Sequence, residues 1–169
     1  MPTPPADTLD DGALAFAEKV FNFARNGQTQ DLAPLLAAGL PANLRNHKGD
    51  SLLMLASYHG YLDTTQLLLS HGADPDLAND RGQTPLAGAV FKAETTLIEA
   101  LIQGRAHINY RPPGGKTALM FAAMFNQRPI IDQLIAAGAD ANAIDDEGQT
   151  ALDLARAMGA TDAVARLGG

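Results

Sequence analysis

The chain has 169 residues, of which 46% are hydrophobic and only 5% aromatic, and its net charge at pH 7 is −7. This is the size of one domain with enough apolar surface for a core, and a composition rich in Ala and Leu favours helices over a β-sandwich. The negative charge disfavours broad binding to nucleic acid or to an anionic membrane surface. The absence of cysteine excludes disulfide scaffolds, cysteine nucleophiles and thiolate zinc sites.

The first segment, residues 1–12, carries three prolines and is expected to form a disordered tail. It holds no Lys or Arg, and no segment of the chain approaches the roughly 20 apolar residues that a membrane span needs. We therefore expect neither a signal peptide nor a membrane helix, and we expect a cytoplasmic protein. The run from Ala13 to Phe21 predicts a helix that caps the N-terminal end of the fold, with Glu18 and Lys19 on its outer face.

From there on the chain repeats with a period of 33 residues. Similar apolar runs begin at four hydroxyl residues, Ser51, Thr84, Thr117 and Thr150. A second column in the same register holds Gly49, Gly82, Gly115 and Gly148, and a third holds Gly39, Gly72, Arg105 and Gly138. Agreement of three columns over three periods predicts a repeat architecture.

Each repeat predicts two helices. The Ser or Thr at its start can cap the first helix, which carries a Leu and an Ala three residues apart on one face, as in Leu86 and Ala89. The second helix supplies apolar pairs such as Leu134-Ile135 and stops at a Gly, which adopts a left-handed conformation at low cost. A single helix pair cannot bury its apolar face, so we expect neighbouring pairs to stack.

The pattern resembles the ankyrin repeat, whose signature is T-P-L-H-x-A at a 33-residue period. Thr84-Pro85-Leu86 matches it most closely, and the resemblance covers about nine-tenths of the chain. It implies an all-α solenoid of stacked helix-turn-helix units with projecting hairpin loops. The units would be a degenerate capping repeat at 13–49, full repeats at 50–82, 83–115 and 116–148, and a truncated capping repeat at 149–169. The Ala-rich, cysteine-free composition resembles that of compact bacterial ankyrin proteins.

The third full-repeat loop departs from the pattern. Arg105 stands where Gly is expected, so either the preceding helix ends one residue sooner or Arg105 adopts a conformation that is costly for a residue with a side chain. The loop also replaces the Asn or Asp found at this point in the other loops by Pro112-Pro113-Gly114-Gly115. We predict that its shape differs from that of its neighbours.

Candidate catalytic and metal motifs are weak. The segment Arg111 to Thr117 superficially suggests a phosphate-binding loop, but Tyr110 stands where the first Gly of that motif is required. Asp145, Asp146 and Glu147 could attract a divalent cation weakly, although a solvated hairpin tip is the simpler interpretation. No serine lies in G-x-S-x-G, and the histidines share no repeat column and have no metal-ligand spacing: His47, His59, His71 and His107. We expect no catalytic residue, metal or cofactor, and no enzyme activity.

The resemblance implies that a partner would contact the loop tips and the concave face of the first helices. One first-helix column there is unusually apolar, with Tyr58, Phe91 and Met124, and together with residues of two neighbouring columns it favours an exposed binding stripe. The alternative is that some of these side chains pack inward as core. The candidate groove residues are Met54, Tyr58, His59, Phe91, Lys92, Met120, Met124 and Phe125.

The loop tips show a gradient from basic to acidic along the chain, which could orient a partner and accelerate its encounter. The alternative is that the tips are polar only because they are solvated. The candidate tip residues are Arg45, His47, Lys48, Arg81, Arg111, Lys116, Asp145, Asp146 and Glu147.

These patterns favour a monomeric, non-catalytic module that binds an unidentified partner protein and neither nucleic acid nor membrane. Two alternatives stay open. A small-ligand or cofactor-handling accessory protein would need a closed pocket, for which Tyr58 and His59 beside Met54 are the candidate cluster. A structural protein would instead bury the apolar stripe against a second copy of itself.

Overall fold

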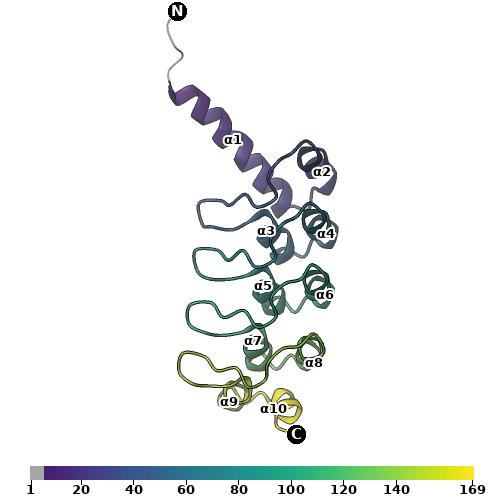
Figure 1. The fold of residues 1–169 in the computed structure, drawn as a ribbon, viewed down its shortest axis with the longest axis vertical. Coiled ribbons are helices and arrows are strands. Elements are labelled where there is room, and N and C mark those ends of the chain that lie inside the picture. Colours follow the sequence, from purple (N-terminus) through teal and green to yellow (C-terminus); the bar gives the residue numbers. More distant parts are fainter. Residues whose placement is uncertain (1–5) are drawn as a thin grey trace, which may run out of the picture.

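The computed structural model describes the backbone of residues 6–169 and the side chains of residues 11–169; the part of the predicted tail at residues 1–5 lies outside the described residues. It is an elongated stack of helix pairs with loops projecting along one side (Figure 1). The described residues form helices and a single isolated β-bridge, between Arg45 and Ser51. The predicted all-α solenoid is confirmed.

The helices form two layers. The inner layer, next to the loops, contains α1 (Ala6–Arg25), α3 (Leu52–Tyr58), α5 (Pro85–Phe91), α7 (Ala118–Met124) and α9 (Ala151–Ala157). The outer layer contains α2 (Thr29–Ala37), α4 (Leu62–Ser70), α6 (Thr95–Gln103), α8 (Arg128–Ala136) and α10 (Thr161–Leu167). Each inner helix packs on the next one and on its own outer helix. Between the pairs run loop 1 (38–51), loop 2 (71–84), loop 3 (104–117) and loop 4 (137–150).

The predicted helix caps are present at all four inner helices that follow a loop. The side-chain hydroxyl of Ser51 accepts the backbone N–H of Met54 at 3.0 Å, and Thr84, Thr117 and Thr150 repeat this bond at 3.3, 3.4 and 3.2 Å. Each cap satisfies one N–H that the helix itself leaves without a partner, which is worth about 1 kcal/mol. These hydroxyl residues therefore fix where each of the four inner helices begins.

The Leu and Ala columns form the core between the inner and outer helices. Ala56, Ala89, Ala122 and Ala155 are fully buried, and their small side chains let neighbouring inner helices approach closely. The outer helices contribute further buried side chains to the same continuous core: Leu68, Ile98, Leu101, Ile131 and Leu134. Because every pair shares this core with its neighbours, the stack depends on contacts between adjacent repeats.

Arg105 adopts the left-handed conformation, with φ at 66°, at the position where Gly72 and Gly138 have φ at 82° and 98°. The outer helix α6 ends at Gln103, in the same repeat column as Ser70 and Ala136, the last residues of α4 and α8. Of the two alternatives stated for this position, the helix keeps its length and Arg105 bears the strain. Backbone geometry at the end of α6 is therefore set by the repeat and overrides the preference of the residue.

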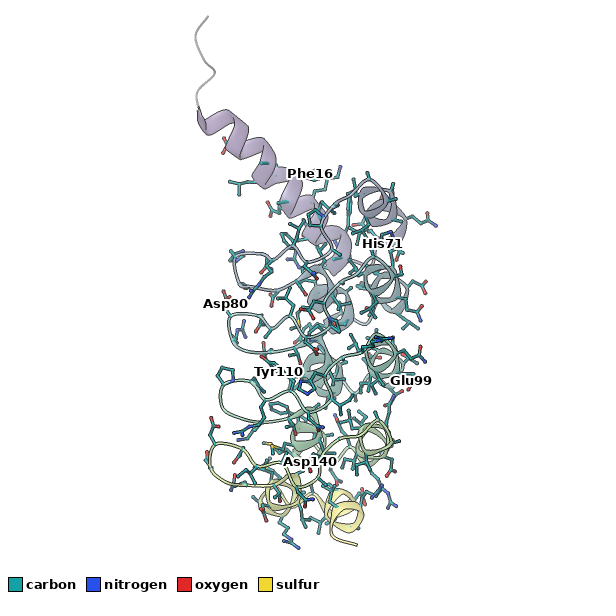
Figure 2. All side chains as sticks on the ribbon, viewed as in Figure 1. Phe16, His71, Asp80, Glu99, Tyr110 and Asp140 are labelled. Carbon is teal, nitrogen blue, oxygen red and sulfur yellow. The ribbon has the colours of Figure 1, made fainter. Side chains whose placement is uncertain are left out.

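Helix α1 begins at Ala6, so the predicted disordered tail is helical over residues 6–12. No proline falls between Ala6 and Gly12, and the acidic residue at position 7, in the first turn, favours a helix N-terminus through its dipole. The first half of α1 projects beyond the stack, where Leu14 and Phe16 are exposed (Figures 1 and 2). The second half packs on α2 and α3 through Val20, Phe21 and Ala24.

Candidate partner-binding groove

Three aromatic side chains lie exposed at the C-terminal ends of successive inner helices, and we call them the aromatic row: Tyr58, Phe91 and Phe125. Their exposed fractions are 38%, 58% and 41%. The rings of Phe91 and Phe125 meet edge to face with centroids 5.6 Å apart, and the Nζ of Lys92 lies 4.7 Å from the centroid of the Tyr58 ring. The exposure expected for these three residues is present.

The methionines predicted beside them behave differently. Met54 and Met120 are buried, with 5% and 1% exposure, and Met124 is half-buried. Met54 and Met120 lie one helical turn before the aromatic row, where the side chain points between neighbouring inner helices; the Sδ of Met120 accepts the backbone N–H of Thr117 at 3.4 Å. The prediction of an exposed stripe is therefore wrong at Met54 and Met120, which belong to the packed interior.

Beside the aromatic row lies a cavity of about 560 Å³, which we call the central cavity. Its walls come from loops 2 and 3 and from α3, α5 and α7: Met54, Tyr58, Arg81, Gly82, Gln83, Ala87, Gly88, Phe91, Pro112, Pro113, Gly114, Lys116 and Phe121. Sequence reasoning did not single out Phe121, whose ring stacks on Phe125 at 6.5 Å. Its repeat column also holds Leu55 and Leu154, so it has the pattern of an ordinary core position.

The central cavity exists because one repeat carries small residues where the others carry large ones. Ala87 and Gly88 of α5 occupy the columns that hold Met54 and Leu55 in the preceding repeat, and Met120 and Phe121 in the following one. A Cβ added at Gly88 would lie 3.4 Å from the Tyr58 ring. In the sequence, this feature is visible as two small residues, Ala87 and Gly88, at repeat positions where the neighbouring repeats carry large side chains.

A second cavity, of about 290 Å³, adjoins the first and is called the basic cavity. It shares Met54, Tyr58, Arg81 and Gln83 with the central cavity, so the two lie side by side. The residues that it adds are Arg25, Asn46, His47, Lys48, Asp50, Leu55, His59 and Asn79. The two cavities and the aromatic row together form what we call the groove.

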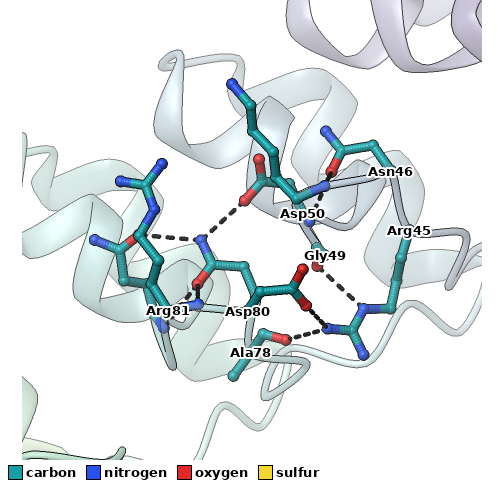
Figure 3. A network of polar contacts seen from close by, with 10 residues as sticks. Arg45, Asn46, Gly49, Asp50, Ala78, Asp80 and Arg81 are labelled. Atoms are coloured by element: carbon teal, nitrogen blue, oxygen red, sulfur yellow. Dashed lines mark hydrogen bonds and ion pairs between the residues drawn. The ribbon is translucent and has the colours of Figure 1, made fainter.

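Several predicted loop-tip residues are held by neighbouring loops. Arg45 donates from Nε to the Gly49 carbonyl at 3.1 Å and from Nη2 to the Ala78 carbonyl at 3.0 Å, and it approaches Asp80 at 3.4 Å (Figure 3). In the same network, Nδ2 of Asn79 donates to Asp50 at 2.9 Å. These bonds connect loop 1 to loop 2.

The same two connections recur between loops 3 and 4. Arg111 pairs with Asp146 at 2.8 Å, and Lys116 pairs with Asp145 at 2.9 Å. Asp145 is only 2% exposed, because its carboxylate also accepts the backbone N–H groups of Glu147 and Gln149 at 2.9 Å each. The prediction that Asp145 belongs to an accessible acidic tip is therefore wrong, and the pKa of its carboxyl is lowered by these backbone bonds and by Lys116.

Loops 2 and 3 lack both connections. The positions that would supply them hold Ala78 with Pro113 and Gln83 with Pro112, and no hydrogen bond or ion pair joins either pair. Nearer the helices, loops 2 and 3 are still joined, because the Asp76 carboxylate accepts the backbone N–H of His107 at 2.7 Å. Both tips line the central cavity, and they contact each other without a polar bond, since a Cβ added at Gly82 would lie 2.9 Å from Cδ of Pro113.

Loop 3 has its own shape, as predicted. In the other loops a side-chain oxygen of Asn46, Asn79 or Asp145 accepts the backbone N–H groups two and four residues later, at 2.9 to 3.0 Å. Pro112 has no such oxygen and no backbone N–H. Loop 3 turns instead through two consecutive glycines with positive φ, Gly114 at 95° and Gly115 at 75°.

The groove is basic although the chain is acidic overall. Arg25, Lys48, Arg81 and Lys116 line it, and Asp50 is the acidic residue that they face. Lys92 adds a positive charge over Tyr58. The pKa of His59 is lowered by partial burial and by the positive charges of Arg25 and Lys92.

The remaining candidate tip residues, His47, Lys48, Arg81 and Glu147, are exposed. Tyr58 and His59 meet edge to face at 5.4 Å, beside Met54 at the boundary of the two cavities. Across the part of the chain that the structure describes, no three His, Asp or Glu side chains gather in a way that could hold a metal ion. Within the same part, no helix is long and apolar enough to cross a membrane.

Comparison with known proteins agrees with this geometry. The family model for ankyrin repeats in three copies matches residues 20–112 and 89–168. A protein of Pseudomonas aeruginosa that carries the name of an ankyrin repeat protein is 57% identical over 63 residues, which is 37% of this chain and 37% of that protein. The match thus spans little more than a third of the relative's own length. Since the family model covers nearly all of the stack, the chain belongs to the ankyrin repeat family.

Proposed function

We propose that this protein is a non-catalytic interaction module, which acts as a cytoplasmic monomer and binds a partner protein through the groove. The observation that carries the proposal is the aromatic row, three exposed aromatic side chains beside a cavity of about 560 Å³. Aromatic residues are enriched among the residues that contribute most to binding, and monomeric proteins seldom leave such side chains clustered on the surface without use.

The scaffold favours binding without reorganisation. The inner helices are capped, stacked and packed on one core, so a partner would meet a preformed surface and little conformational entropy would be lost on association. Ankyrin repeats generally act as protein interaction modules, which agrees with this proposal.

One observation favours the small-ligand alternative. The volume of the central cavity lies within the range of sites that hold small molecules. Such sites combine apolar walls with a few precisely placed polar groups, whereas the polar groups of this cavity are chiefly Arg81, Gln83 and Lys116, at its loop side. Protein binding therefore remains the first proposal.

The test is capture of partners from the lysate of the native host, with the wild type and a groove variant, Tyr58→Ala/Phe91→Ala/Phe125→Ala. A matched control, Leu14→Ala/Phe16→Ala/Ile144→Ala, removes three side chains of similar exposure, 63%, 48% and 49%, outside the groove. Circular dichroism verifies that both variants are folded.

The proposal expects one protein to be recovered by the wild type and the control and lost by the groove variant. Recovery of the same protein by all three would contradict it. A molecular mass in solution that doubles as the protein concentration rises, in the wild type but not in the groove variant, would support self-association through the groove instead of binding to a different protein.

A further inference from the structure

The distribution of charge separates the groove from the rest of the surface. Acidic residues are spread over the outer helices, as at Asp31, Asp63, Glu99, Asp132 and Asp162, and Figure 2 shows Glu99 on the side away from the loops. The cavities, by contrast, are lined by four basic residues and one acidic residue. A chain with a net charge of −7 therefore presents a local positive field in the groove.

One of the groove cations, Lys116, is paired with Asp145, but three others have no ion-pair partner in the described part of the chain. Among the residues that the structure describes, no carboxylate lies within 4.0 Å of the charged groups of Lys48, Arg81 or Lys92. Asp50, the acidic residue of the groove, accepts a hydrogen bond from Asn79. Asp80, Asp145 and Asp146 are engaged by Arg45, Lys116 and Arg111. These four carboxylates are thus engaged by neighbouring loops, whereas the three cations beside the cavities are available to a ligand.

The apolar part of the groove lies between these cations. The cavity floor at Ala87 and Gly88 is flanked by the rings of Tyr58, Phe91 and Phe121. Arg81 lines both cavities, and Lys92 covers the Tyr58 ring. A ligand that fills the floor with an apolar group would place its flanking groups next to positive charge.

We propose that the groove binds an acidic segment of a partner protein, which inserts a bulky apolar side chain above Ala87 and Gly88 and sets its carboxylates against Arg81, Lys92 and Lys48. This inference rests on the proposed function and specifies the chemistry of the partner. Both parts of the ligand are needed: the apolar side chain supplies buried area, and the carboxylates supply orientation and rate of encounter.

The shape of the groove favours a protein segment over a small molecule, because the basic lining continues past the central cavity to Lys48 and Arg25. Cations and aromatic rings also occur in sites for single-stranded nucleic acid. A long polyanion that extended from the groove toward the C-terminal end of the stack would, however, meet Asp140, Asp146 and Glu147 in loop 4, where like charge repels it. A short acidic segment does not need to reach that loop.

The test selects ligands from a display library of random short peptides against the wild-type protein, and the affinity of the best selected peptide is then measured for three variants. Arg81→Glu/Lys92→Glu reverses the groove charge, and Ala87→Met fills the cavity with the residue that occupies this column at Met54 and Met120. The control Lys19→Glu/Arg128→Glu makes the same change in net charge at exposed residues outside the groove lining. Thermal unfolding verifies that each variant is folded.

The expected result is a set of peptides with net negative charge and at least one large apolar residue. Their affinity should fall about tenfold, or about 1.4 kcal/mol, with each groove variant and stay unchanged with the control. Binding to the wild type should also weaken as sodium chloride rises, because salt screens exposed charges; this measurement needs no variant.

Other outcomes would overturn the inference in distinguishable ways. Neutral or basic peptides that still lose affinity with Ala87→Met would refute the acidic partner and leave the proposed function intact. Peptides insensitive to both groove variants, or no enrichment at all, would contradict the inference and the groove as the binding surface. Equally tight binding of a labelled oligothymidine, lost with Arg81→Glu/Lys92→Glu, would assign the groove to nucleic acid instead.

Discussion

At the scale of single residues, repeat geometry imposes conformations that some side chains resist. Arg105, Ala93 and Asn126 have positive φ values of 66°, 58° and 55°, whereas other repeats place glycine in the same columns. A left-handed conformation costs a residue with a Cβ about 1–2 kcal/mol, and Gly avoids that cost but loses more entropy on folding. The stack tolerates the strain because the stacked helix pairs on both sides fix where each turn must go.

Arg105→Gly is therefore expected to stabilise the protein by about 0.5–1 kcal/mol, the left-handed strain less the larger entropy loss of glycine. Urea denaturation followed by circular dichroism measures the change. Gly72→Ala is the matched opposite, since φ is 82° and a Cβ would have no neighbour within 4 Å, and it should destabilise by about 1 kcal/mol. Equal stability of Arg105→Gly and wild type would show that Arg105 is not strained.

Asp145 makes stability depend on pH. Its pKa in the folded protein lies below the ordinary value of 3.8, so the folded state favours the carboxylate more than the unfolded state does. The stabilisation is complete above the ordinary pKa and is lost as the pH falls through the lowered one. Asp145→Asn keeps the turn that Asn46 and Asn79 make in their own loops but loses this titration.

The free energy of unfolding should thus fall less between about pH 7 and about pH 3 in Asp145→Asn than in wild type. Urea denaturation at the two pH values gives the difference. Glu147→Gln, two residues along, serves as control and should follow the wild type, because this side chain is exposed and makes no ion pair among the described residues. The same pH dependence in all three proteins would contradict the role assigned to Asp145.

At the scale of elements, the loops differ in how firmly each is joined to the next. At their tips, loops 1 and 2 are joined by side-chain bonds and by the backbone N–H of Asp80, which donates to the Lys48 carbonyl, and loops 3 and 4 are joined by two ion pairs. Loops 2 and 3 are joined by a hydrogen bond near the helices alone. Loop 3 also lacks the side-chain bonds that hold the turn in its neighbours. Opening of loop 3 should therefore require less free energy than opening of the other loops.

Native-state hydrogen exchange tests this expectation. The backbone N–H of Gly115 bonds to the Pro112 carbonyl at 2.8 Å, and Gly49, Gly82 and Gly148 make the equivalent bond at 2.9, 2.9 and 3.0 Å. Despite this similar geometry, Gly115 should exchange fastest of the four. The four glycines act as mutual controls, and slower exchange at Gly115 than at Gly82 would show that proline stiffness outweighs the missing connections.

At the scale of the whole molecule, the 33-residue period predicted the architecture because a repeated helix pair can bury its apolar face in essentially one way, by stacking. The helix caps, the buried Ala positions and the different shape of loop 3 could each be predicted by comparing equivalent positions of the repeats. The period could not predict the burial of Met54 and Met120, since the direction of that column depends on how closely neighbouring inner helices approach. Nor could it predict that Arg45 and Asp80 would meet, because that pair spans 35 residues and joins two loops.

The central cavity shows the same limit. Ala87 and Gly88 were visible in the sequence as small residues, but whether the space beside them stays open depends on the neighbouring residues that surround it, from α3, α7 and the tips of loops 2 and 3. Functional features of a repeat protein thus lie where one repeat departs from the others, while the fold is determined by what the repeats share.

If a partner binds in the groove, a crosslinker placed there should capture it. Phe91 is replaced with the photo-crosslinking amino acid p-benzoylphenylalanine, and cells of the native host are irradiated. We expect one covalent adduct with a single partner protein at position 91 and no adduct at Phe16, a control of similar exposure on the projecting half of α1. An adduct at position 16 with none at position 91 would contradict binding in the groove.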